Sequence, residues 1–332
     1  MAHELEIING QAQMAYAGEV PWHGLGVPVS NDLAPRQIME KAGLNWKVVK
    51  QPLYYDNNFD YSPRSRIEVP NKFALVRQTD NKLLDVIGTD WYPVQNEEAF
   101  NFFSEFVHAG DMEMHTAGSL KGGRNIFALA KIKESFDLFG GDKVDSYLLF
   151  SNPHQYGKSI DIRFTPIRVV CNNTLSLALD EKAERSVKIH HRSEFDADSV
   201  KETLGLASSK FAKYKEAAEF LGKKRYTVDS LIDYYNNVFP LTSSKKVDEG
   251  KIKDKVDQLS RNAKLAYDAI EQQPGANFAK GSWWQAYNSV TFITDHVQGR
   301  NADNRLYSSW FGGNQVCKRK ALSKALEYAE AA

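Results

Sequence analysis

Residues 112–170 contain short apolar stretches separated by glycine-containing turns, and this pattern constrains the fold more than any other part of the sequence. Because glycine readily adopts the backbone angles of tight turns, the pattern predicts an antiparallel β-meander. The predicted strands are Met112–Leu120, Asn125–Lys133, Asp145–Asn152 and Ile160–Val170. The predicted turns are Lys121-Gly122-Gly123, Gly140-Gly141-Asp142 and Gln155-Tyr156-Gly157-Lys158.

The last of these strands shows the clearest alternation. Ile160, Ile162 and Phe164 alternate with polar residues, which is typical of a strand with one buried face. Pro166 then interrupts the alternation. Because proline cannot donate a ladder hydrogen bond, a bulge or an edge position is predicted there.

The segment before the meander predicts two helices and a hairpin. A helix is expected to begin near Pro35, and the hairpin pairs Phe73–Val76 with Leu83–Ile87. A second helix follows Asn96, whose side chain is expected to act as its N-cap. Residues 1–34 are interpreted as an N-terminal arm.

The chain after the meander predicts helices. A helix is expected to begin near Asn172-Asn173, and from about residue 195 apolar residues recur at steps of three and four. Strands followed by helices indicate an α+β fold: a β-hairpin, a helix and an antiparallel β-meander, followed by a helical C-terminal region. The expected divisions are the arm 1–34, an α+β core 35–194 and a helical region 195–332.

Charge and cysteine content limit the function classes. The chain has 42 basic and 42 acidic residues, which argues against a simple polyanion-binding protein. The balance is uneven, because residues 1–181 contain 17 Lys/Arg and 23 Asp/Glu. Two distant cysteines, no signal-peptide pattern and no apolar run of membrane-spanning length predict a cytoplasmic protein without a membrane partner.

No complete catalytic constellation is present. The sequence lacks a nucleophile elbow, a P-loop, a dinucleotide fingerprint and a zinc-protease motif, so no catalytic residue, metal or cofactor is predicted. Gly118–Gly123 is glycine-rich, but it is interpreted as a hairpin turn and not as a phosphate cradle opening a helix. Asp295-His296 lacks a visible third ligand, and a structural histidine at a helix end is favoured.

Basic and amide side chains are concentrated in and around the meander. If its turns lie on one side of the sheet, they form a basic rim that holds phosphate groups. The candidate nucleic-acid-binding residues are Lys121, Arg124, Lys158, Arg163, Arg168, Asn172, Asn173 and Tyr92, the last as a stacking ring. The alternative is that the basic residues are unrelated solvated turn residues and that the asparagines only cap a helix.

Three further segments have competing interpretations. Trp22 and His23 stand beside glycines and could line a pocket, although docking of an N-terminal arm is favoured. Trp283 and Tyr287 share a helix face, which favours core packing over base stacking. The basic run 318–320 could contact phosphates or complement a helix dipole.

Several phrases together resemble a known family. They are Trp22–Gly26, Gly88–Asn96, Ala117–Leu120, Ile167–Leu175, Tyr287–Thr291 and Asp295-His296. The chain resembles the phage/plasmid-like family that carries a domain-of-unknown-function label. The resemblance implies genes on phages, prophages and plasmids and a bacterial cytoplasmic setting. It implies no established activity.

A second resemblance concerns architecture alone. A hairpin, a helix and a β-meander closed by a helix are similar to the core of the Rad52-like single-strand annealing proteins. That resemblance implies a homo-oligomeric ring that holds single-stranded DNA in a basic outer groove.

Three functions follow from the sequence. The first is a single-stranded-DNA-binding or annealing factor, which forms an oligomer and acts in recombination. The second is an interaction protein that modulates a host or defence component. The third is an unrecognised enzyme with a pocket near Trp22 and His23.

Overall fold

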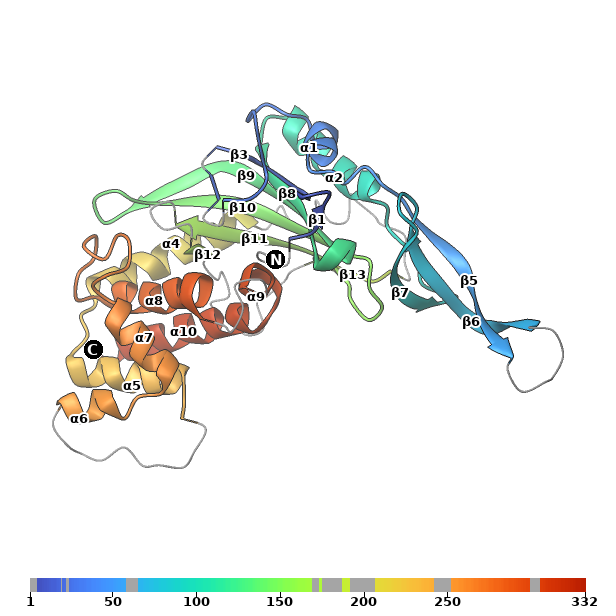
Figure 1. Ribbon diagram of the computed structural model, residues 1–332. Helices are drawn as coiled ribbons and strands as arrows, with labels where there is room; N and C mark the ends of the chain where they lie inside the picture. The colour runs from blue at the N-terminus through green and yellow to red at the C-terminus, as the bar shows by residue number, and fades with distance from the viewer. Residues whose placement is uncertain are drawn as a thin grey trace.

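A large, mostly antiparallel sheet forms the centre of the computed structural model (Figure 1). The structure describes residues 5–18, 20–21, 24–57, 65–168, 173–174, 187–191, 207–241, 252–298 and 305–332. Within these residues the sheet has eight strands in the order β12-β11-β10-β9-β8-β3-β4, with β13 also paired to β11. The meander predicted from the sequence therefore forms the middle of this sheet, and the α+β class is confirmed.

The strands of the large sheet range from two to fourteen residues. They are β3 (Met14–Ala17), β4 (Val27–Val29), β8 (Met112–Leu120), β9 (Asn125–Leu138), β10 (Asp142–Pro153), β11 (Ile160–Arg168), β12 (Asn173–Thr174) and β13 (Val187–Ile189). A short 3₁₀ turn, η1 (Lys121–Gly123), joins β8 to β9. Pro166 pairs with Ser146 without a shift in the β10–β11 register. On its other side it has no strand partner among the described residues, because β12 and β13 pair with other residues of β11, so within these residues Pro166 has the predicted edge position.

A smaller sheet projects from one end of the molecule as an arm (Figure 1). It has three antiparallel strands, β5 (Val48–Asn57), β6 (Ser65–Arg77) and β7 (Lys82–Gly88). The β6–β7 pair is the predicted hairpin. A separate two-stranded ribbon near the N-terminus consists of β1 (Ile7–Ile8) and β2 (Gln11–Ala12).

The two faces of the large sheet have different coverings. Helices α1 (Pro35–Lys41) and α2 (Asn96–His108) pack on one face (Figure 1). Ile126 and Ala128 of β9 enter this core, whereas Phe127 and Leu129 point to the opposite face, where α9 (Arg305–Phe311) packs. This period of two is what a strand requires when both of its faces are buried.

The C-terminal part is helical, as the sequence predicts. Its helices are α4 (Ala207–Lys223), α5 (Val228–Val238), α6 (Ile252–Asp257), α7 (Arg261–Ala269), α8 (Trp283–Phe292), the π-helix η2 (Ile293–Val297), α9 and α10 (Gly313–Glu330). Trp283, Trp284 and Tyr287 are buried in the core of this region. The core-packing interpretation of these aromatic residues is therefore confirmed.

The helical region packs directly on the sheet through the end of the β9–β10 hairpin. Leu138 and Val144 belong to the helical core, and Trp284 donates a hydrogen bond from Nε1 to Oδ2 of Asp142 at 2.9 Å. The ring of Phe139 lies against the backbone of Gly222 in α4, at a place where a β-carbon would overlap the ring. The hairpin thus anchors the two parts of the molecule to each other.

A buried ionic network joins the small sheet to the large one. Arg77 at the end of β6 is 1% exposed and bonds to Glu6 at 2.8 Å and to Asp80 at 2.6 Å. Glu6 also accepts from Lys82 at 3.2 Å and from Ser119 of β8 at 2.8 Å. Burial, the largest influence, raises the pKa of Glu6, but the bonds from Arg77, Ser119 and Lys82 outweigh it and lower that pKa.

Two asparagines differ from their predicted roles. Asn96 is the first residue of α2 rather than its N-cap, and its buried side chain bonds to the Leu44 carbonyl at 2.9 Å and to His154 at 2.9 Å. The helix predicted near residues 172–173 is wrong at Asn173, which begins strand β12 and pairs with Arg168. At Asn96, bonds to distant groups replace the local capping bond, because buried polar groups need partners. At Asn173, backbone pairing with β11 takes the place of a helix start.

Replacing Arg77 with methionine should destabilise the protein strongly. The substitution leaves Glu6 buried without its main counter-ion, so the free energy of unfolding should fall by about 3–5 kcal/mol. Urea denaturation monitored by tryptophan fluorescence measures this change. Arg66→Met is the matched control, since Arg66 is 78% exposed beside Asp56 and its loss should change stability by less than about 0.5 kcal/mol. Equal effects of the two substitutions would contradict the role given to Arg77.

Gly222→Ala should also be destabilising, although alanine is the better helix former. The added methyl group meets the Phe139 ring, and the overlap should cost about 1–3 kcal/mol. In a double-mutant cycle with Phe139→Ala, the Gly222→Ala cost should disappear, because the opposing ring is absent. A stabilising effect of Gly222→Ala in the native background would show that the hairpin does not dock there.

Candidate nucleic-acid interface

Helix α9 creates a polar cleft at one end of the large sheet. The cleft has a volume of about 330 Å³ and lies between α9, the start of α10, the start of β9, the β10–β11 turn and β13. Segments that are far apart in the sequence thus converge on one concavity. Among its lining residues are the basic side chains of Lys158, Arg163, Lys188 and Arg319 and the aromatic rings of Tyr307 and Phe311.

Two lysines form the exposed rim of the cleft. Lys158 belongs to the β10–β11 turn, and Lys188 lies on β13, which pairs with the first residues of β11. Neither side chain has a hydrogen-bond or ion-pair partner among the described residues. Exposed ammonium groups held on a concave surface are suited to contact phosphate oxygens from solvent.

Arg163 is held more firmly than the lysines. Its guanidinium forms a two-pronged bond with Asp161, donates to the carbonyl oxygen of Trp310 at 3.2 Å and lies 5.5 Å from the ring centre of Phe311. Its side chain is 18% exposed and that of Asp161 is 14% exposed. Arg163 therefore fixes α9 to the sheet and leaves little of its guanidinium facing solvent.

The floor of the cleft is polar. Asn125 begins β9 and accepts from the Ser151 hydroxyl at 2.7 Å, which orients its amide. Its Nδ2 has no hydrogen-bond partner in the described part of the chain, and the residue is 4% exposed. The atom is covered as placed, so a small shift of the side chain is needed before this donor can satisfy an acceptor on a bound molecule.

The turn residues predicted from the sequence lie near the cleft but differ in their surroundings. Lys121 in η1 lies 3.3 Å from the ring centre of Tyr307, so it contacts the aromatic wall. Arg124 follows η1 directly, is exposed and makes no side-chain bond to another described residue. With Lys158 and Arg163, these residues place four of the candidate basic groups at one end of the sheet.

The remaining candidates are not brought into the cleft. Tyr92 is 59% exposed, but its ring does not line the cleft and is approached by Lys50 Nζ, 4.7 Å from its centre. For Arg168 and Asn173 the structure describes only the backbone, and Asn172, Trp22 and His23 lie outside the described residues. The pocket predicted near Trp22 and His23 therefore stays a prediction.

Four residues that line the cleft were not identified from the sequence, namely Lys188, Asn125, Tyr307 and Phe311. Lys188 lies beside the histidine pair 190–191, of which the first is exposed and the second is buried against Trp91 with 4.2 Å between ring centres. Of the basic run 318–320, only Arg319 lines the cleft. An aromatic pair spaced four apart, as Tyr307 and Phe311 are, is a signal for one helix face and could have been noted.

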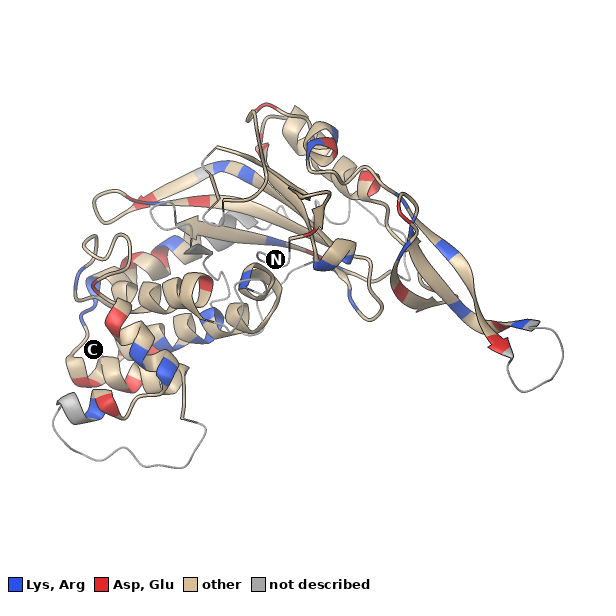
Figure 2. Cartoon of the chain, in the orientation of Figure 1, with Lys and Arg blue, Asp and Glu red and all other residues tan. Residues whose placement is uncertain are grey.

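The group of positive charges at the cleft is a local feature of the surface. Figure 2 shows Lys and Arg interspersed with Asp and Glu over both the sheet and the helices.

No group of three or more described His, Cys, Asp or Glu side chains suits a metal ion. Within the described ranges, no helix has the length and apolar character needed to cross a membrane.

Comparison with known families assigns the chain. A family model for a domain of unknown function, DUF932, matches residues 83–310. The chain belongs to the DUF932 family. The matched DUF932 segment runs from β7 to α9 and so contains most of the polar cleft, and three lining residues, Phe311, Gln315 and Arg319, lie beyond it. No curated protein matches the chain, and no solved structure does.

Arg163→Met should loosen α9 rather than simply remove a positive charge. The substitution leaves the Asp161 carboxylate and the Trp310 carbonyl without this donor, so stability should fall by about 1–3 kcal/mol. Amide hydrogen exchange over residues 305–311 should become faster. Lys158→Met is the control and should leave both measurements unchanged, because that side chain has no partner among the described residues.

Proposed function

We propose that this DUF932 protein binds single-stranded DNA, with the backbone passing over the polar cleft. The observation that carries the proposal is the convergence of Lys158, Lys188 and Arg319 with two aromatic rings in one open, polar concavity. Single-strand binding sites combine such a basic groove with rings on which bases stack. The geometry divides these tasks between the lysine rim and the rings of α9.

Each part of the cleft has a defined contribution in this proposal. The ammonium groups of Lys158 and Lys188 neutralise phosphates, and Asn125 Nδ2 donates to a phosphate or base oxygen. Tyr307 and Phe311 offer ring surface to bases that are not paired. Arg163 acts as a positioning residue, since it fixes the helix that carries both rings.

The setting of the proposed activity follows from the family resemblance. We place the protein in the cytoplasm of a bacterial cell that carries a phage or plasmid, where it assembles with further copies of itself and supports recombination. A neutral overall charge, with 42 basic and 42 acidic residues, is compatible with this activity only if the basic groups act locally. The cleft provides that local concentration.

A second candidate function is binding of a host or defence protein. The arm formed by β5 and β6 favours it, because Tyr54, Tyr55 and Ile67 are 50%, 51% and 38% exposed. Exposed aromatic and aliphatic side chains on a projecting element are typical of protein contacts. The oligonucleotide experiment below separates the two functions, since the second predicts no salt-sensitive binding of DNA.

The double variant Lys158→Ala/Lys188→Ala should lose affinity for single-stranded DNA and salt sensitivity together. A fluorescently labelled oligonucleotide is titrated with the full chain between about 50 and 200 mM salt, and anisotropy is recorded. Removing two phosphate contacts should lower the slope of log affinity against log salt by about 1.4.

Lys213→Ala/Lys223→Ala is the matched control for this experiment. Both lysines are exposed on α4, away from the cleft, and their removal changes the net charge by the same amount. The control should bind like the native protein. Absence of binding by the native protein at low salt, or an equal loss in both double variants, would overturn the proposal.

A further inference from the structure

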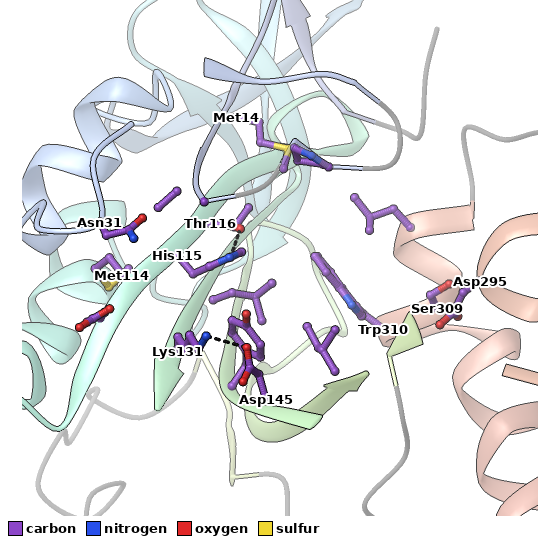
Figure 3. A pocket seen from close by; sticks show the side chains of 18 of the residues that line it. Met14, Asn31, Met114, His115, Thr116, Lys131, Asp145, Asp295, Ser309 and Trp310 are labelled. Atoms are coloured by element: carbon purple, nitrogen blue, oxygen red, sulfur yellow. Dashed lines mark hydrogen bonds and ion pairs between the residues drawn. The ribbon is translucent and has the colours of Figure 1, made fainter. Parts of the chain in front are cut away.

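A second and larger hollow lies on the other side of α9. Its volume is about 370 Å³, and its walls come from β3, β8, β9, β10 and α9 (Figure 3). It shares the sheet face of the polar cleft but no lining residue with it. Met14, Leu129 and Leu306 supply apolar surface, and Tyr147 and Trp310 supply aromatic rings.

Irregular backbone is concentrated around this cavity. The β8–β9 register shifts between Met114 and Thr116, so His115 is an extra residue in β8 without a paired residue in β9. The β9–β10 register shifts between Asp145 and Tyr147. The π-helix η2 supplies Asp295 to the same cavity. Such shifts and π-helices interrupt otherwise regular elements and frequently mark functional sites, because they redirect side chains.

Charges at the cavity are balanced within the protein. Asp145 is paired with Lys131 at 2.6 Å and with Lys143 at 3.7 Å, and Asp295 is paired with the buried Lys318 at 2.7 Å. Glu113 lies on the exposed rim. The cavity therefore offers no unpaired buried carboxylate to a ligand, and its two lysines already face Asp145.

The imidazole of His115, which lines the cavity, is uncharged near neutral pH. Burial, assisted by Lys131 and opposed by Asp145, lowers the pKa of His115 to about 4. Its Nδ1 is 2.8 Å from the Thr116 hydroxyl (Figure 3). Its ring meets that of Tyr147 edge-on, with 5.1 Å between centres. The imidazole thus contributes a neutral aromatic surface to the wall.

Three polar atoms on the lining residues have no hydrogen-bond partner in the described part of the chain. They are Trp310 Nε1, Ser309 Oγ and Asp145 Oδ1, the last lying 3.7 Å from Lys143 Nζ, beyond hydrogen-bond distance. The three residues are 6%, 5% and 5% exposed and the three atoms themselves are covered, so neither water nor a ligand reaches them without a small side-chain rotation. The indole is a donor only, the carboxylate is an acceptor only, and the hydroxyl can do both.

We propose that this cavity binds an uncharged planar heterocycle whose edge both accepts and donates hydrogen bonds, which is the chemistry of a nucleobase. The rings of Tyr147, His115 and Trp310 contact its faces or edges. With the small side-chain rotations that expose these atoms, Trp310 Nε1 and Ser309 Oγ donate to its acceptor atoms, and Asp145 Oδ1 accepts from its donor group. The proposal does not depend on DNA binding at the polar cleft, because the two concavities share no lining residue.

Isothermal titration calorimetry with adenosine, inosine, cytidine and thymidine tests the proposal on the full chain. At least one nucleoside should bind with a Kd of about 0.1 mM, which is the order expected for a ligand of this size, and D-ribose should not bind. Trp310→Phe keeps a ring against Phe127 but removes the donor, and should weaken binding about ten-fold.

Two further variants secure the interpretation. Ser309→Ala removes only a hydroxyl and should weaken binding even if Trp310→Phe proves too unstable to assay. Lys158→Ala/Lys188→Ala should bind the nucleoside like the native protein, because neither lysine lines this cavity. Absence of nucleoside binding at about 5 mM, or unchanged affinity in both Trp310→Phe and Ser309→Ala, would overturn the proposal.

A second titration distinguishes a base that belongs to a bound DNA strand from a free nucleoside. Trp310→Phe is titrated with the labelled oligonucleotide after its nucleoside affinity has been measured. If oligonucleotide affinity also falls, the cavity receives a base from a bound strand. If only nucleoside affinity falls, the ligand is a free nucleoside or a related small molecule.

Discussion

The buried contact between Arg77 and Glu6 ties together three parts of the chain. Arg77 ends a strand of the projecting sheet, Glu6 lies in the N-terminal segment, and Ser119, a further partner of Glu6, is the second-last residue of β8 in the large sheet. Burying two charges is expensive, so the pair contributes more to the choice of arrangement than to net stability. An arrangement that separates the two while one of them stays buried would leave a charge without its partner.

The long β9–β10 hairpin connects the remaining parts. Near its open end it forms the middle of the large sheet, and at its tip Leu138 and Val144 become part of the helical core. A helical region that shares core residues with a sheet cannot move independently of it. This connection keeps α9 in place over the sheet, and the bond from Arg163 to the Trp310 carbonyl fixes its position.

Much of the fold could be predicted from periodicity because periodicity reports which faces are buried. Ile160 and Ile162 alternate with polar residues and are fully buried, and the apolar seams after residue 207 form helices. The roles predicted for Asn96 and Asn173 were wrong for different reasons. The Asn96 side chain bonds to distant groups in place of the local capping bond, and the segment that contains Asn173 pairs as a strand with β11.

The candidate site could be predicted only in part. The turn lysines were visible in the sequence because turns expose charged residues. The sequence did not reveal that four segments converge, namely β9, the β10–β11 turn, β13 and α9. Their convergence depends on where the seven-residue helix α9 packs on the sheet. A strand as short as β13 has no internal period to reveal it, so Lys188 carried no signal of its own.

Helix α9 explains why two adjacent concavities select different chemistry. On one side it presents Tyr307 and Phe311 to an open cleft with an excess of basic groups, where an anionic polymer can lie without losing all of its water. On the other side it presents Ser309 and Trp310 to a more apolar cavity in which every buried carboxylate already has a lysine. A phosphate entering that cavity would lose its hydration and would compete with Asp145 for Lys131 and Lys143, whereas an uncharged heterocycle loses little. The same short helix therefore separates a surface suited to a charged backbone from a cavity suited to a neutral ring.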